Sequence, residues 1–139
     1  AKTDRKGGVM PFTHIYISAD KPDDYVKKVS QSLHEALTES FAVPQKDCFQ
    51  IINRLTNEQR VYDKEYACPV NQARSEDWLL FEITAGKPRD TKTKEAFYRT
   101  LLTKLQASVG LNQADLMVII STNQTEEWSF SQGAMATLP

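Results

Sequence analysis

The sequence Ile15-Tyr16-Ile17-Ser18-Ala19-Asp20-Lys21-Pro22 decides the fold, because a close counterpart follows as Phe81-Glu82-Ile83-Thr84-Ala85-Gly86-Lys87-Pro88. Each stretch has the pattern of a strand followed by a turn, after which apolar residues recur at helical spacing. Each unit then closes on a second apolar strand, at Ile51-Ile52 in the first and at Ile119-Ile120 in the second. Two copies about 67 residues apart indicate a duplicated β-α-β unit, because a solenoid needs more repeats.

The predicted fold class is α/β (α+β), with a four-stranded mixed sheet and two helices. Strands are expected at residues 12–18, 48–55, 78–84 and 116–121, and helices at residues 22–41 and 90–109. Right-handed crossovers in both units place the two helices on the same face of the sheet.

The apolar residues leave one face of this sheet to be covered. Residues 116–121 are almost wholly apolar, which predicts a central strand that is covered on both faces. The face opposite the helices carries Phe49 and Ile51, which a single copy could not cover. We therefore expect this face to be buried by oligomerisation.

Length and composition predict a single domain over residues 11–139, preceded by an extension or a cloning remnant at residues 1–10. A formal net charge of -1 gives no electrostatic reason to expect nucleic acid or an anionic membrane as a partner. No apolar run approaches the length of a membrane span. Cys48 and Cys68 lack metal-ligand spacing, so we expect free thiols in a reducing cytoplasm and no metal site.

A long segment without periodicity, residues 53–77, separates the two units. It carries arginine and tyrosine side chains, namely Arg54, Arg60, Tyr62, Tyr66 and Arg74. A loop of this length in a small domain is usually functional or lies at an interface, and we favour an interface.

Two cations mark a candidate site at the start of the second helix. Lys87 and Arg89 flank Pro88, where the helix dipole and free amides already make the potential positive. An anion bound between the two side chains would explain this placement. The alternative is that both are solvated turn residues, since Lys21-Pro22 occupies the same place in the first unit.

The dipeptide Met10-Pro11 offers a second candidate group. If the chain began at Pro11, its nitrogen would be a secondary amine, and nearby cations and apolar side chains would lower its pKa below that of an ordinary α-amino group. Such an amine can act as a general base or acid near neutral pH. In the sequence as written, Met10 acylates this nitrogen, and an amide has no basic lone pair. The alternative is that Pro11 only begins an edge strand.

These features resemble the tautomerase superfamily, and most nearly its malonate semialdehyde decarboxylase-like group. The resemblance spans nearly all of residues 11–136. It rests on the order and spacing of Pro11, Ala42-Val43-Pro44 with Asp47 and Phe49-Gln50, Lys87-Pro88-Arg89, and Glu127-Trp128-Ser129-Phe130. Members of this superfamily use an amino-terminal proline on a duplicated β-α-β fold and assemble as homotrimers.

The resemblance implies a role for each matching residue. By position, Pro11 would be the catalytic amine, Arg89 would bind the substrate carboxylate, and Asp47 would activate water or substrate. Lys87 falls where decarboxylase relatives carry a second arginine. Lysine cannot bind a carboxylate in the bidentate way that arginine does.

The remaining residues of the implied site are apolar or structural. Trp128 and Phe130 resemble the apolar wall that excludes water from the proline. His34 matches a helix position that often holds histidine in such relatives, and we interpret it as structural.

The resemblance implies an enzyme that needs no cofactor and acts on a small oxo acid, by keto–enol tautomerisation or by decarboxylation or hydration. An alternative is a non-catalytic trimeric member with a capped Pro11 that binds a carboxylate or a protein. A ferredoxin-like domain that regulates or binds RNA shares the order of elements. It is disfavoured, because the sequence lacks the aromatic and basic strand pattern of single-strand RNA recognition.

Overall fold

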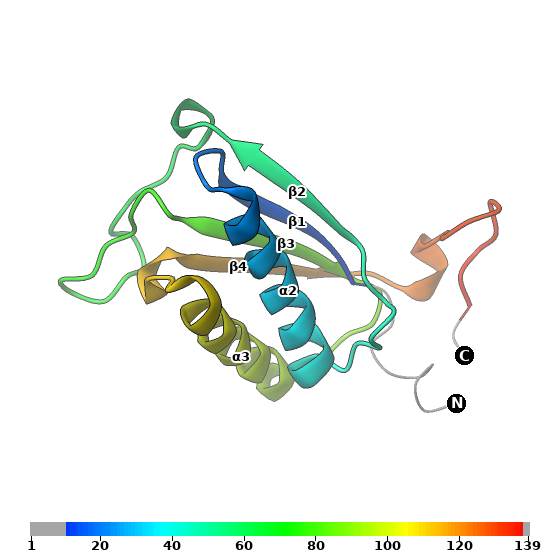
Figure 1. Ribbon diagram of the computed structural model, residues 1–139. Coiled ribbons are helices and arrows are strands. Elements are labelled where there is room, and N and C mark those ends of the chain that lie inside the picture. The colour runs from blue at the N-terminus through cyan, green and yellow to red at the C-terminus, as the bar shows by residue number, and fades with distance from the viewer. Residues whose placement is uncertain (1–10, 138–139) are drawn as a thin grey trace.

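The computed structural model describes residues 11–137, in which two β-α-β units form one sheet with two helices against it (Figure 1). The elements in chain order are β1 (Pro11–Ser18), α2 (Asp23–Ser40), β2 (Gln50–Leu55), β3 (Leu79–Ala85), α3 (Thr91–Val109) and β4 (Leu116–Thr122). Short 3-10 turns lie at Asn57–Gln59, Gln113–Asp115 and Thr125–Glu127. The predicted duplication is confirmed, with element boundaries close to those expected from the sequence.

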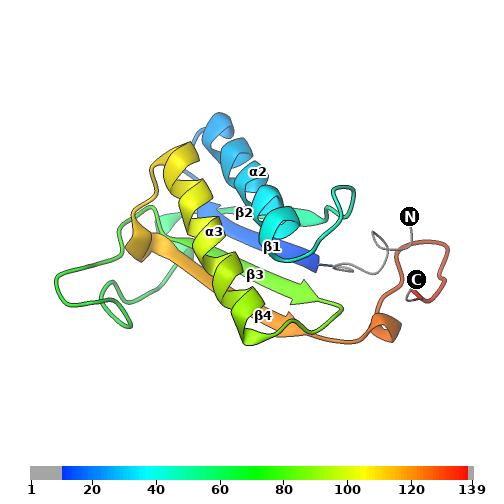
Figure 2. The ribbon, with the colours of Figure 1, turned by 90° about the horizontal axis from the view of Figure 1, so that it is seen from below.

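The four strands lie in the order β2-β1-β3-β4. Within each unit the two strands are parallel, and the units meet through an antiparallel pairing of β1 with β3. Both helices cover the same face, as the right-handed crossover rule predicts (Figure 2). The predicted mixed sheet with two helices on one face is therefore confirmed.

A single apolar core lies between the sheet and the helices. Its fully buried side chains alternate along the central strands and recur at helical spacing on both helices: Ile15, Ile17, Phe81, Ile83, Val29, Leu33, Leu37, Phe97, Leu101 and Leu105. Burying one such side chain contributes roughly 1.5–3 kcal/mol, so this core accounts for the packing of the two layers. Within residues 11–137, no helix combines the length and the apolar character needed to cross a membrane.

The position of β4 corrects one prediction. This strand is at the edge of the sheet and not at its centre, and its side chains alternate between half-buried and exposed. Met117 and Ile119 point away from the helices and are 37% and 42% exposed. The apolar run therefore does not reflect coverage on both faces within one chain. It reflects an apolar outer face that a single copy leaves open.

The outer face of the sheet, opposite the helices, combines apolar side chains with a polar network. Phe49 and Ile51 are 48% and 51% exposed, as the sequence predicted for an uncovered face. On the two central strands, the Tyr16 hydroxyl of β1 donates to Glu82 of β3 at 2.8 Å. A half-exposed apolar sheet face of this kind is characteristic of a surface that binds another protein chain.

The segment between β2 and β3, residues 56–78, forms an arm at one end of the sheet (Figure 1). Its base is fixed by the buried Arg60, which donates to the carbonyls of Trp78 and Glu76, each at 2.9 Å. The fully buried carboxylate of Asp115 accepts from both the amide and the hydroxyl of Ser75, each at 2.6 Å. The expected role of this segment as an interface stays a prediction.

The Asp115 clamp leads to a test of stability. Asp115→Ala removes a buried carboxylate acceptor and leaves two part-buried donors of Ser75 without it, so we expect the free energy of unfolding to fall by roughly 2–3 kcal/mol. The matched control is Asp24→Ala, which removes an exposed ion pair with Lys28 at 3.1 Å and one negative charge from the first turn of α2, and should change stability by about 1 kcal/mol or less. Urea denaturation measures both. Equal effects of the two substitutions would contradict this account of the arm.

Candidate functional site

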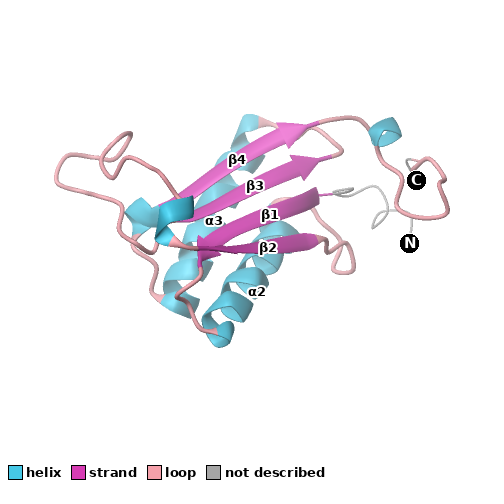
Figure 3. Ribbon diagram, turned by 90° about the horizontal axis from the view of Figure 1, so that it is seen from above, coloured by secondary structure: helices cyan, strands magenta, loops and turns pink. Residues whose placement is uncertain are grey.

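One end of the sheet brings together segments that lie far apart in the sequence. Because β1 is antiparallel to β3, Pro11 at the start of β1 pairs with Ala85 at the end of β3, and Ala85 pairs in turn with Thr122 at the end of β4. On the other side of β1, Thr13 pairs with Gln50 at the start of β2. The segments that carry all the predicted site residues therefore meet at this end (Figure 3).

Arg89 is held at this end by backbone carbonyl groups. Its Nε and Nη2 donate to the carbonyl of Phe41 at 3.3 and 3.1 Å, and its Nη1 donates to the carbonyl of Lys87 at 2.8 Å. The guanidinium also lies over the Phe41 ring, 4.3 Å from its centroid. The guanidinium has more N–H groups than these bonds use, so it can still receive a carboxylate.

The end of α2 explains why Phe41 offers its carbonyl. Both Phe41 and Val43 donate their amides to the carbonyl of Leu37, and Ala42 between them has a left-handed φ of 56°. The last carbonyls of a helix lack partners within the helix and carry its partial negative charge. A guanidinium at this position satisfies one of them and is stabilised by the helix dipole.

The half-buried position of Arg89 changes its acidity. Burial lowers the pKa of the guanidinium to about 10, and the nearby charge of Asp47 offsets part of that effect. A cation that has lost part of its hydration gains more from an arriving anion than a solvated cation does. The electrostatics of this position therefore favour a negatively charged ligand.

Asp47 lies on the connection from α2 to β2, residues 41–49. Its amide donates to the carbonyl of Pro44 at 3.0 Å, which closes a tight turn, and its side chain is half-buried. Nearby, Nε2 of His34 on α2 bonds the carbonyl of Gln45 at 2.7 Å. The charge of Asp47 acts on the guanidinium of Arg89 from this turn.

Pro11 is buried and points toward the helix layer, because the alternation along β1 places it on the same side as Thr13 and Ile15. Arg89 and Phe41 lie on this same side, at the same end of the sheet. The residue that acylates the proline nitrogen in this sequence, Met10, lies outside the described residues.

Lys87 belongs to the turn that follows β3, with an exposed side chain. Its carbonyl accepts the bond from Arg89, so the turn itself helps to orient the guanidinium. Asp90 caps the following helix by accepting from the Thr93 amide at 2.8 Å. This cap fixes where α3 begins and therefore the backbone position of Arg89, which directly precedes the cap.

Trp128 and Phe130 lie on the tail, the segment of residues 123–137 that follows β4. The two rings stack with centroids 5.7 Å apart, and Phe130 packs on Phe49 at 5.6 Å. Phe49 directly precedes β2, and β2 and β4 are the two outer strands. A tail that leaves β4 and reaches Phe49 must therefore cross the ends of β3 and β1, where Pro11 lies.

Sequence reasoning missed the groups that hold the site residues. Phe41 ends the first predicted helix and was not named for the site, yet its carbonyl and its ring both contact Arg89. Asn123 accepts the indole N–H of Trp128 at 2.5 Å and so orients the tail. A backbone carbonyl and a tail asparagine leave no recognisable pattern in a single sequence.

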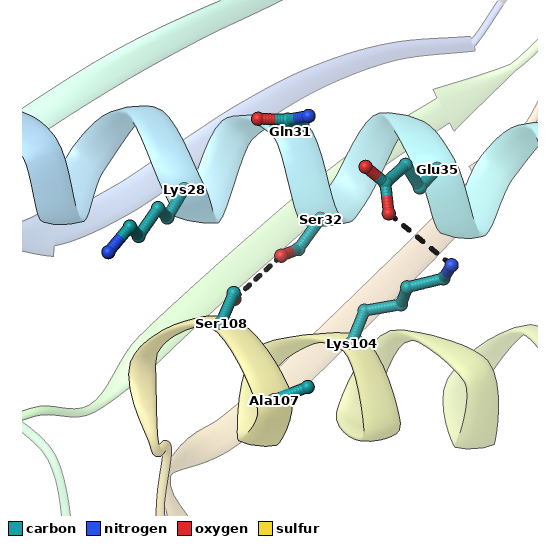
Figure 4. A pocket seen from close by; sticks show the side chains of 7 residues that line it. All are labelled: Lys28, Gln31, Ser32, Glu35, Lys104, Ala107 and Ser108. Atoms are coloured by element: carbon teal, nitrogen blue, oxygen red, sulfur yellow. Dashed lines mark hydrogen bonds and ion pairs between the residues drawn. The ribbon is translucent and has the colours of Figure 1, made fainter.

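Other groups in the described residues do not form a competing site. A hollow of about 380 Å³ between α2 and α3 is lined by Lys104, whose ammonium pairs with Glu35 at 3.3 Å (Figure 4). The same ammonium pairs with Glu39 at 2.6 Å. The charges of these three side chains are therefore paired with each other. No group of three or more His, Cys, Asp or Glu side chains within residues 11–137 is arranged to hold a metal ion.

Comparison with known proteins identifies the family. Residues 47–131, which make up more than half of the chain, match the family model described as tautomerase enzyme. The chain belongs to this tautomerase family. It is 27% identical over 124 residues to the probable tautomerase YusQ of Bacillus subtilis (strain 168), and the alignment covers 89% of this chain and 95% of that protein. The probable tautomerase YrdN of the same organism is also 27% identical, with 89% and 93% covered.

Solved structures share the fold of this tautomerase. A malonate semialdehyde decarboxylase superposes with a TM-score of 0.81 at 23% identity, covering 88% of this chain and 92% of that protein. A fused 4-OT symmetric trimer superposes with a TM-score of 0.69 at 14% identity, covering 91% and 97%. At these identities the likeness establishes the tautomerase fold.

The anchoring of Arg89 gives a prediction about stability. Arg89→Lys keeps the charge, but a single ammonium cannot reproduce the paired bonds to Phe41 and the bond to Lys87, so we expect a loss of about 1–2 kcal/mol. Arg99→Lys, on the exposed side of α3, is the control and should stay within about 0.5 kcal/mol of the parent. Thermal unfolding followed by circular dichroism compares the two. A fully stable Arg89→Lys protein would show that the carbonyl contacts contribute little.

Proposed function

We propose that residues 11–139 form a single catalytic domain that, when its chain begins at Pro11, tautomerises a small oxo acid or removes carbon dioxide from one. Pro11 would be the catalytic amine, Arg89 the carboxylate-binding residue and Asp47 an assisting carboxylate. The observation that carries this proposal is the convergence of these residues at one end of the sheet, where the charge of Asp47 acts on the partly desolvated Arg89.

In the proposed tautomerisation, Arg89 binds the substrate carboxylate and holds the enol next to Pro11. The neutral amine takes the hydroxyl proton of the enol and returns a proton to the neighbouring carbon, which yields the ketone. A guanidinium and apolar groups close to the amine would keep its pKa near neutral pH, where both steps are accessible. Fixed cations in a water-poor site stabilise the charge that develops on the enolate.

In the proposed decarboxylation, the protonated amine polarises the substrate carbonyl while Asp47 assists. The bond to the carboxylate carbon breaks, and its electron pair passes to the enolate as carbon dioxide leaves. Trp128 and Phe130 would shield this step from water, which is supported by the course of the tail across the ends of β3 and β1. The resembling decarboxylase of known structure has both decarboxylase and hydratase activities, so hydration belongs to the same proposal.

Lys87 would be an auxiliary cation for the same carboxylate. Its flexible, exposed side chain fits a role as a point charge, whereas Arg89 fixes the orientation of the substrate.

A second candidate function follows from the peptide bond at Pro11. In the sequence as written, Met10 acylates the proline, and an amide nitrogen cannot act as a base. A protein that keeps this bond would bind a carboxylate at Arg89 without catalysing its conversion.

We further propose that the outer face is covered by two other copies of the chain in a homotrimer. The exposed Ile51 and Met117 support this, because they lie on opposite outer strands and leave apolar surface across the face. One protein that shares the fold is itself a symmetric trimer.

The catalytic proposal predicts a sharp dependence on the first residue. A protein beginning at Pro11 should ketonise phenylpyruvate enol or consume malonate semialdehyde, and Pro11→Ala should lower kcat/KM by about 100-fold or more. The chain beginning at Ala1 is the matched control and should be inactive, because its proline nitrogen is an amide. Absence of both activities, or equal rates for parent and Pro11→Ala, would refute the catalytic proposal.

The trimer is tested separately by charge on the outer face. Ile51→Asp places a carboxylate in the proposed interface, so we expect the mass in solution to fall from three chains to one. Gln31→Asp places the same carboxylate on the exposed side of α2, away from the outer face, and should leave the mass unchanged. Light scattering after size-exclusion chromatography measures the mass. A parent that is already monomeric contradicts the assembly.

A further inference from the structure

The connection between α2 and β2, residues 41–49, carries Asp47 without belonging to a helix or a strand. It is fixed at its start by the bonds from Arg89 to the Phe41 carbonyl. At its end, the carbonyl of Phe49 accepts the Thr13 amide at 3.1 Å. The turn that contains Asp47 lies between these two points, so its position depends on contacts made within the connection.

His34 supplies such a contact from α2. The turn is closed by the bond from the Asp47 amide to the Pro44 carbonyl, and Gln45 lies inside it. The carbonyl of a residue in this place does not take part in the bond that closes the turn, so it can accept from a donor outside the turn. Nε2 of His34 lies 2.7 Å from this oxygen. Because a carbonyl only accepts, Nε2 must carry the proton.

The second ring nitrogen of His34 indicates what the residue is for. Nδ1 is buried and has no hydrogen-bond partner among the described residues. An apolar side chain could fill the same space without burying an unpaired nitrogen, which is unfavourable. The ring therefore makes no hydrogen bond to the described residues of the interior. Its one directed interaction is the hydrogen bond to the turn that contains Asp47.

We propose that His34 is a positioning residue for Asp47: its bond to the Gln45 carbonyl holds the turn so that the carboxylate stays next to Arg89. The proposal rests on the proposed function only in its consequence for catalysis. His34 acts through the backbone of the connection and does not touch the substrate. It differs from a packing residue because the effect requires a donor directed at one oxygen.

Three variants separate these roles. His34→Leu keeps apolar bulk but has no donor, His34→Asn is polar but too short to reach the carbonyl, and His34→Gln retains an N–H donor on a longer side chain. Thr38→Val is the matched control on the same helix, because its hydroxyl bonds only the helix carbonyl of Glu35, at 2.9 Å. If His34→Leu folds poorly, the comparison of His34→Asn with His34→Gln still decides the question.

The first measurement needs no activity. Proximity to a guanidinium stabilises the ionised carboxylate of Asp47, so moving the turn away should raise its pKa, by about half a unit or more. Carbon-detected NMR of labelled aspartate, assigned with Asp47→Asn, gives this value. We expect the rise in His34→Leu and His34→Asn, a value close to the parent in His34→Gln, and no change in Thr38→Val.

The second measurement uses protein that begins at Pro11. Because Arg89 still binds the substrate, His34→Leu and His34→Asn should lower kcat by about 10- to 100-fold and change KM by less than about threefold, and His34→Gln should recover most of the rate. An Asp47 pKa that is unchanged in His34→Leu and His34→Asn overturns the proposal. An unchanged kcat in these variants of an active parent also overturns it. An inactive parent refutes the proposed function instead, and the NMR result then stands alone as the test of positioning.

Discussion

The contact between Arg89 and the carbonyl of Phe41 holds together the parts on which this site depends. It joins the turn after β3 to the end of α2, and so links the second β-α-β unit to the first at the sheet end where Pro11 lies. The contact is favourable because a helix terminus presents unpaired carbonyls and partial negative charge, while the Phe41 ring offers its face to the same cation. It is also costly, because burial lowers the pKa of the guanidinium to about 10. A cation held in place by neutral partners remains able to bind an anion.

The sequence predicted the architecture well because the duplication repeats every local signal. A strand, turn or helix pattern that occurs a single time can be ambiguous. The same patterns become reliable when they recur in the same order. The error concerned β4, whose apolar residues were interpreted as central when the strand is at the edge. Periodicity shows that both sides of a strand are apolar, but it cannot show whether the second side is covered by the same chain. Met117 and Ile119 lie on the side of β4 that the same chain leaves exposed.

The residues of the candidate site could be named from the sequence, but the groups that hold them in place could not. Pro11, Asp47 and Arg89 could be named from spacing and resemblance, and the register of β1 with β2 and β3 brings their segments to one end of the sheet. The carbonyls of Phe41 and Gln45 could not be named, because any residue type supplies a carbonyl and only the backbone path directs it. The left-handed conformation of Ala42 could not be predicted either, because glycine at a turn indicates this conformation and alanine does not.

The duplication also allows the two ends of the sheet to be compared. The first unit carries Lys21-Pro22 where the second carries Lys87-Pro88, so the sheet has two related ends. At the first of these, Lys21 forms an ion pair with Asp77 at 2.5 Å and lies over the Tyr25 ring, and Arg54 is paired with Asp23 at 2.7 Å. Carboxylates thus neutralise the cations there. At the other end, the hydrogen bonds of Arg89 go to neutral carbonyls, which orient the guanidinium, and the charge of Asp47 acts on it as well. The two ends are built from the same backbone pattern, and they differ in the groups that hold their cations.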